Sequence, residues 1–266
     1  MNNLGVIRLK KMGLLMLVIG CLTVSVQASK ISVRYEKPVS AKYEPIYKTL
    51  KSNHRRMLGE SVRSLRQLYD WPNPIQVVVA SCGFVNSRYQ VGDQVVVICY
   101  ESLYNKIYDY PQAATSKRAF ANRVFQNTMF TFWHEMGHAL IDQLGLIGEA
   151  NELQSEIMAD EFAALSMIWR GEQKWNHVLM ISALHFKNKS TSEPGKSYKN
   201  HPDDDIRYQK MIVLLHGSAQ KSYSRLSDQV EQIKWLDKSS KEYYLERSMF
   251  WEHKLRSNMR RDFFNK

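Results

Sequence analysis

The sequence predicts a helix-rich α+β protein with a small sheet or ribbon near its amino terminus. Apolar residues recur at helical spacing from Tyr43 to Tyr69 and again over most of the second half of the chain. Only two runs, Ile75 to Ala80 and Gln94 to Ile98, have the composition of strands. The chain has 266 residues, 44% of them hydrophobic, so it can bury one large core. Because no repeat or linker stands out, we expect a single domain over 29–266, with a core at 71–218 and a helical carboxy-terminal extension at 219–266.

The first 28 residues have the pattern of an export signal peptide. A basic segment at 8–11 precedes an apolar stretch from Met12 to Val26, and Ala28 offers a small residue at the cleavage site. The apolar stretch is shorter than the roughly 20 residues that a membrane span needs. Lipid attachment at Cys21 is an alternative. We therefore expect an exported protein, periplasmic or secreted, that begins near Ser29.

The segments before the sheet and within it follow from breakers and turns. Residues 29–38 should form an extended lead-in, and the helix from Tyr43 to Tyr69 should end at Trp71-Pro72-Asn73-Pro74. The two strands should form a ribbon, with a turn at Val91-Gly92-Asp93 in the segment that joins them.

Two cysteines remain if Cys21 leaves with the signal peptide. Cys82 and Cys99 each stand at the end of a predicted strand, and disulfides persist outside the cytoplasm. We expect a Cys82–Cys99 bridge that ties the ribbon together. A metal-ligand pair or two buried thiols are the alternatives.

The rest of the chain should be mostly helical. The helix that begins at Ser116 should end by Leu146-Ile147-Gly148, and a polar loop should run from Lys187 to Pro202. The expected helices cover residues 101–108, 116–144, 151–170, 175–186, 204–215 and much of 227–261.

His134-Glu135-Met136-Gly137-His138 is the stretch that indicates chemistry. Positions i and i+4 of a helix share one face, so both imidazoles can reach one metal ion while Glu135 lies beside them as a general base. This spacing predicts a hydrolase with one catalytic Zn²⁺. Such a site commonly has a third protein ligand. A third histidine six residues after His138 is excluded, because Leu144 stands there.

The next helix offers the missing ligand. Glu156 and Asp160 are four residues apart and can face the same way, within a segment that is apolar nearly all round. This Glu-x-x-x-Asp arrangement resembles that of the thermolysin-like gluzincins. The resemblance implies that Glu156 is the third zinc ligand and that Asp160 accepts a hydrogen bond from a ligand histidine. A wet helix face is the alternative.

A wider set of residues is similar to an uncharacterised family of bacterial secreted proteins labelled as metallopeptidases, over about residues 71–218. That resemblance implies a zincin-like fold and no particular substrate. It rests on Cys82, Asn86 and Tyr89, Cys99-Tyr100-Glu101, the His134 to Asp142 run, Glu156, Asp160 and Phe162-Ala163-Ala164, and continues through His201, Asp204, Arg207 and Tyr208 to Gly217-Ser218.

Further candidates flank the metal motif. His201, Arg207 and Tyr208 lie around the start of a predicted helix and could stabilise a developing oxyanion. Asn86 and Tyr89 lie in the ribbon and could contact an extended peptide. The alternatives are a loop histidine for His201, an arginine paired with an acid for Arg207, and a turn asparagine and a packed tyrosine for Asn86 and Tyr89.

Charge favours anionic partners without choosing one. The net charge is +11, and removing the three signal-peptide cations leaves 11 − 3 = +8. A membrane surface, a cell-wall polymer or an acidic substrate would fit, whereas no nucleic-acid motif is present, and a solvated basic surface is the simpler reading. We therefore expect an exported zinc metallopeptidase that acts on peptides. A catalytically inactive envelope binding or assembly factor, and a zinc hydrolase of another bond, are the alternatives.

Overall fold

The computed structural model describes residues 30–108, 116–146, 152–192, 202–219 and 221–258. The predicted signal peptide, Cys21, the break at Tyr110-Pro111 and His201 lie outside these residues. The helix-rich α+β prediction is confirmed, and it is the arrangement of the sheet that differs most from expectation.

Four strands form one sheet in the order β1-β2-β4-β3. They are β1 Ile31–Tyr35, β2 Ile75–Ala80, β3 Arg88–Gln90 and β4 Val95–Cys99. β2 runs parallel to both β1 and β4, and β3 pairs antiparallel with β4. The predicted two-stranded ribbon is therefore wrong. The turn around Gly92 joins β3 to β4, and the extended lead-in supplies β1.

The helix predicted from Tyr43 to Tyr69 is in fact broken into α1 (Glu44–Ser52) and α2 (Leu58–Leu68). Asn53 ends α1, because its side-chain amide donates to the Thr49 carbonyl at 2.8 Å and its backbone leaves the helical conformation. α3 (Tyr100–Tyr108) and α4 (Lys117–Gln143) match the predicted helices closely. α4 ends before the predicted stop, since Gly145 adopts a φ of 61°.

The second half contains α5 (Glu152–Trp169), α6 (Gln173–Ser192), α7 (Asp204–Ser218), α8 (Ser227–Glu231) and α9 (Ser240–Leu255). α6 runs through Ser192, so the polar loop predicted from Lys187 starts too early. The helical pattern predicted over much of 227–261 corresponds to two separate helices, α8 and α9. A capping box formed by Ser239 and Glu242 starts α9 afresh.

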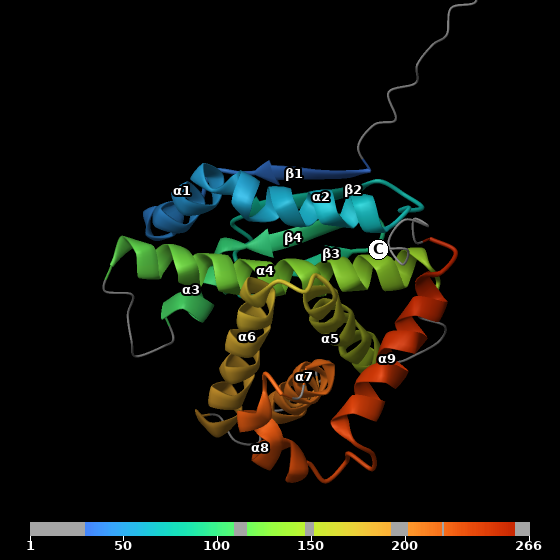
Figure 1. Cartoon of the computed structure of the whole chain (residues 1–266). Helices are drawn as coiled ribbons and strands as arrows, with labels where there is room; N and C mark the ends of the chain where they lie inside the picture. The colour runs from blue at the N-terminus through green and yellow to red at the C-terminus, as the bar shows by residue number, and fades with distance from the viewer. Residues whose placement is uncertain (1–29, 109–115, 147–151, 193–201, 220, 259–266) are drawn as a thin grey trace, which may run out of the picture.

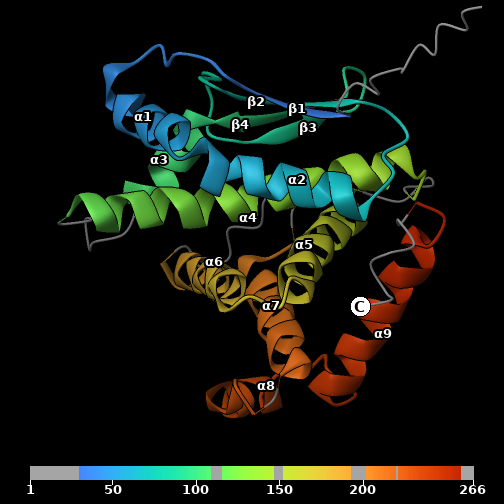
Figure 2. The ribbon, with the colours of Figure 1, turned by 45° about the horizontal axis from the view of Figure 1, so that its top comes forward.

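α4 lies at the centre of the molecule. In Figures 1 and 2, α1, α2 and α4 lie along the sheet, and α5 to α9 lie on the side of α4 away from the sheet. Every residue of α4 from Thr128 to Gly137 is buried as a result. One hydrophobic core includes buried side chains from Ile31 in β1 to Leu255 in α9. In the described part of the chain, no helix combines the length and apolarity that crossing a membrane requires.

Candidate metal centre

α4 brings the two motif histidines together. The helix starts at Ser116, whose hydroxyl accepts a hydrogen bond from the Ala119 N–H at 3.1 Å. One turn separates His134 from His138, and their Nε2 atoms lie 3.2 Å apart with the rings nearly perpendicular. Both lone pairs can therefore point at one position between the rings.

Glu156 on α5 completes a triangle of three ligand groups, with a different carboxylate oxygen nearest each histidine. Its Oε2 lies 3.3 Å from His134 Nε2, and its Oε1 lies 3.2 Å from His138 Nε2. This approach depends on Gly137. A Cβ at that position would lie 3.0 Å from the Cα of Ala159, so only glycine lets α4 and α5 come this close without adjustment.

The triangle fits a tetrahedral zinc site. Zinc bonds to nitrogen and carboxylate oxygen measure roughly 2.0 to 2.2 Å, which puts adjacent ligand atoms about 3.3 to 3.6 Å apart. The two Nε2 atoms lie 3.2 Å apart, and each lies 3.2 to 3.3 Å from a different oxygen of Glu156, distances close to that edge length. Two imidazoles and one carboxylate are also a ligand set typical of catalytic zinc. This group can therefore bind a metal ion.

The outer nitrogens of both histidines have acceptors. His134 Nδ1 lies 2.8 Å from Asp160 Oδ1, and His138 Nδ1 lies 3.1 Å from Ser155 Oγ. A carboxylate only accepts, so His134 donates from Nδ1, and in the neutral ring Nε2 then keeps its lone pair for a metal. Arg207 holds Asp160 in turn through two hydrogen bonds of 2.7 Å.

The electrostatics of this cluster favour a cation. Burial alone would raise the pKa of Asp160, but Arg207 and His134 hold it well below its usual range. Burial alone would lower the pKa of His134, but hydrogen bonds to Asp160 and Glu156 raise it to about 10. The pocket therefore stabilises positive charge at the imidazole, where a metal ion would supply it.

Glu135 and the triangle open onto a cavity of about 1040 Å³. Glu135 is only 5% exposed and lines the wall. The other walls come from the segment around β3 and from α3, α5, α6 and α7. The cavity is large enough for several residues of a peptide.

The structure brings some of the other candidates to this cavity. Asn86 and Tyr89 line it, and the Tyr89 hydroxyl donates to Asp142 at 2.8 Å. Arg207 also lines it, although its guanidinium is engaged by Asp160. Tyr208 does not line it, because its buried hydroxyl donates to Gln229 at 2.9 Å. No role is assigned to His201, which the structure does not describe.

Two contacts at the site escaped sequence reasoning. Ser155 bonds to His138, and its position directly before Glu156 was a usable signal. Lys106 reaches the cavity from α3 and donates to Thr131 Oγ1 at 2.8 Å. Nothing in the sequence around Lys106 indicates this position, because it depends on how α3 packs against α4.

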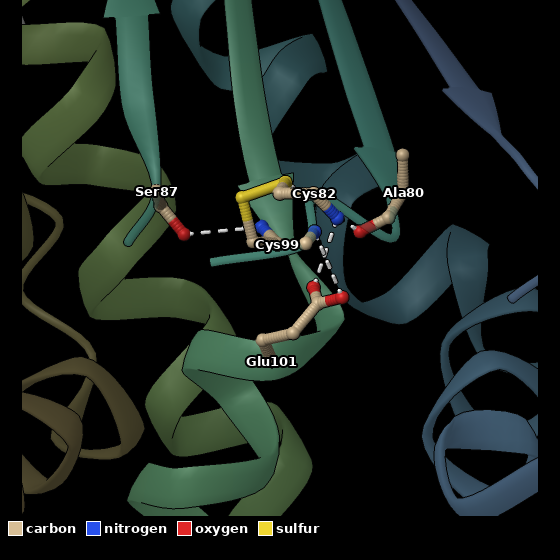
Figure 3. Close-up of a disulfide and its surroundings, with 6 residues drawn as sticks. Ala80, Cys82, Ser87, Cys99 and Glu101 are labelled. Carbon is tan, nitrogen blue, oxygen red and sulfur yellow. Dashed lines mark hydrogen bonds between the residues drawn. A yellow bond between two sulfur atoms is a disulfide. The ribbon is translucent and has the colours of Figure 1, made fainter. Parts of the chain in front are cut away.

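The predicted disulfide between Cys82 and Cys99 is confirmed, with the two Cα atoms 5.5 Å apart. Figure 3 shows Glu101 below the bridge, where its carboxylate accepts hydrogen bonds from the N–H groups of Cys82 and Gly83 at 3.0 and 3.2 Å. Ser87 Oγ accepts from the Cys99 N–H at 3.2 Å. The segment that leads into β3 at the cavity rim is thereby fixed. A metal site made by these cysteines is excluded.

Comparison with curated proteins and with solved structures found no match to this chain. A family model matches residues 35–255, a longer stretch than the 71–218 expected from the sequence. The additional residues include α1 and α2, which pack into the same core as α4 and α5. The chain belongs to the domain-of-unknown-function family DUF4344, described as "Putative metallopeptidase".

Proposed function

We propose that the protein is a zinc-dependent peptidase in which His134, His138 and Glu156 hold one Zn²⁺ and Glu135 is the general base. The observation that carries the proposal is the convergence of His134, His138 and Glu156, whose ligand atoms lie within 4.8 Å of one another, beside a buried glutamate at a cavity wall. Membership of the metallopeptidase family supports peptide hydrolysis as the reaction.

Zn²⁺ in such a site supplies a Lewis acid that polarises a carbonyl oxygen and lowers the pKa of water to about 7. Glu135 takes a proton from the attacking water and returns it to the leaving amine. Among the described residues, no donor lies within hydrogen-bond distance of the Glu135 carboxylate, so its oxygens are available for that proton. Asp160 and Ser155 hold the two imidazoles in position.

The edge strand is a platform for the substrate. Among the described strands, β3 pairs with β4 alone, so its outer edge keeps backbone donors and acceptors that can pair with an extended peptide. Asn86, Ser87 and Tyr89 in and before this strand line the cavity. The bridge between Cys82 and Cys99 supports an exported location, because such bonds persist in oxidising compartments.

Glu135→Gln tests the enzyme proposal. The wild type, loaded with zinc, should cleave members of a diverse peptide library, and the variant should lose about 10²- to 10⁴-fold in kcat, the contribution typical of a general base. Zinc content should be unchanged, because Glu135 is not a proposed ligand. Glu231→Gln, an exposed acid on α8, is the control and should keep full activity.

Two results would overturn the proposal. One is a zinc-loaded wild type that cleaves no peptide, which would favour a binding or assembly factor or a hydrolase of another bond. The other is a Glu135→Gln variant that cleaves as fast as the wild type.

A further inference from the structure

Lys106 extends from α3 into the cavity close to the proposed base. Its Nζ donates to Thr131 Oγ1 at 2.8 Å. Thr131 stands one turn before Glu135 on α4, so the two side chains share a helix face about 5 to 6 Å apart along the axis. The ammonium group is therefore held within roughly one helical turn of the catalytic end of the cavity.

Lys106 differs from the other cations on its wall. Arg207 is paired with Asp160 at 2.7 Å, and Lys189 is paired with Asp204 at 3.2 Å. Among the described residues, no carboxylate lies within 4.0 Å of the Lys106 ammonium. An ammonium has three donors, and removing it from water is costly unless an anion compensates the charge. The Lys106 ammonium is therefore suited to bind an anion from outside the described part of the protein.

The pKa values of Lys106 and His185 agree with a concentration of positive charge in this part of the cavity. Burial and the charge of Arg207 lower the pKa of Lys106 to about 8, against the opposing effect of Glu135. Lys106 therefore stays mostly protonated at neutral pH. Burial, with the charges of Lys106, Lys189 and Arg207, lowers the pKa of His185 to about 3, so positive charge is concentrated at this end of the cavity.

We propose that Lys106 binds a carboxylate of the substrate, and that the protein selects peptides with a carboxylate within one or two residues of the scissile bond. The anionic groups of an unmodified peptide are carboxylates, and each residue of an extended chain spans roughly 3.3 to 3.6 Å. A carboxylate one or two residues from a bond held beside Glu135 would reach the ammonium group. This specificity rests on the proposed peptidase function and sharpens it.

Matched peptides distinguish the two possible sources of the carboxylate. One pair has the same cleavage site followed by either a free carboxy terminus or an amide. The other pair is amidated and carries either Glu or Gln next to the scissile bond. Wild type should cleave the charged member of at least one pair about 10- to 100-fold more efficiently, with the difference mainly in KM.

Variants of Lys106 test whether this residue causes the preference for charged peptides. Lys106→Met should abolish the difference in cleavage between the charged and neutral members of each pair, whereas Lys106→Arg should retain most of it. Lys210→Met is the matched control. Lys210 is another partly buried lysine, next to Glu161, but it lies outside the cavity and its loss should leave the preference intact.

A binding measurement separates failure of this inference from failure of the peptidase function. Succinate should bind zinc-loaded Glu135→Gln protein about tenfold or more tightly than the Glu135→Gln, Lys106→Met double variant by calorimetry. Equal succinate affinities, or equal loss of activity on charged and neutral peptides, would overturn the role of Lys106 even if the wild type is an active peptidase. Lack of peptide cleavage combined with Lys106-dependent succinate binding would instead overturn the peptidase function and leave the carboxylate site standing.

Discussion

Two adjacent buried acids on α5 have nearly the same chemistry and different surroundings. Asp160 is 4% exposed and Glu161 is 3% exposed. Asp160 accepts two hydrogen bonds from Arg207 and a third from His134. Glu161 accepts from Arg247 Nε and Nη2, at 3.0 and 2.6 Å, and from the Tyr243 hydroxyl at 3.3 Å. Both are buried carboxylates compensated by an arginine, but only one touches a proposed metal ligand.

The difference shows that burial and charge do not by themselves identify a functional acid. Glu161 connects α5 to α9 through Arg247. Asp160 connects α5 to α7 through Arg207 and also orients the imidazole of His134. The partner of the carboxylate decides its role. Two glycines also differ in their distance from the candidate metal centre. Gly137 permits the close approach of α4 to α5 at that centre, and Gly217 permits the close approach of α7 to α9 away from it.

Neutralising each acid should give the largest effects. Asp160→Asn and Glu161→Gln each leave a partly buried arginine without its anion, which should lower the free energy of unfolding by about 3 kcal/mol. Urea denaturation measures this loss. Only Asp160→Asn should also weaken zinc binding, by about 10- to 100-fold, because it alters the acceptor of His134. Competition with a chromophoric chelator measures the affinity, and an equal loss of zinc affinity in both variants would remove the distinction between the two acids.

Removing the disulfide should affect the sheet side without affecting the metal. The bridge joins residues 17 apart, so replacing Cys82 and Cys99 with serine should cost about 3 kcal/mol of stability. Zinc affinity should stay the same, because neither cysteine belongs to the His134, His138 and Glu156 group that could hold the metal. KM for peptides should rise as the segment before β3 loosens. A variant that lost zinc affinity while remaining folded would contradict the separation between this segment and the metal centre.

The two glycines offer a finer test. Gly137→Ala would place a Cβ 3.0 Å from Ala159 Cα, and Gly217→Ala would place one 2.7 Å from the Ser240 carbonyl carbon. Both should lower stability, by about 1 to 3 kcal/mol for Gly137→Ala and by at least as much for Gly217→Ala. Zinc affinity should fall only in Gly137→Ala, since α5 carries Glu156. Unchanged zinc affinity in that variant would show that the close approach of α4 and α5 is not needed to place the ligand.

The smallest predicted effect concerns the second histidine. Ser155→Ala removes a neutral hydrogen-bond partner of His138, so zinc affinity should fall by only about 2- to 10-fold. Ser182→Ala is the control, because Ser182 is also buried but bonds to the Val178 carbonyl in α6. A loss in Ser155→Ala as large as that in Asp160→Asn would mean that a carboxylate is no better than a hydroxyl as a support for the site.

The central helix and the proposed metal ligands could be predicted because their sequence signals are local. His134 and His138 share a helix face through their spacing, and Glu156 lies on the next helix along the chain. The sheet was harder. β3 has three residues, Arg88–Gln90, with no buried residue in its pattern, and the parallel pairing of β2 and β4 depends on contacts distant in sequence. The break at Asn53 was missed because the apolar spacing continues across it.

The residues that line the cavity were also difficult to predict, because their positions depend on packing between distant parts of the sequence. Lys106 reaches the cavity only because α3 packs against α4, and Arg207 finds Asp160 across 47 residues of sequence. Tyr208 follows Arg207 directly yet faces Gln229 instead, since neighbouring positions on a helix point in different directions. The proposed metal ligands were therefore predictable, as was the position of Asn86 and Tyr89 near the site, whereas the position of Lys106 was not.

The zinc content of the purified protein after chelation, reloading and dialysis tests the central claim most directly. Elemental analysis should find one zinc per chain in the wild type and in Glu161→Gln. It should find much less than one zinc per chain in Glu156→Gln. Glu161→Gln is the control, because it also neutralises a glutamate on α5, whereas only Glu156→Gln removes a proposed zinc ligand. A wild type without zinc, or a Glu156→Gln variant that binds zinc as tightly as the wild type, would contradict the metal centre.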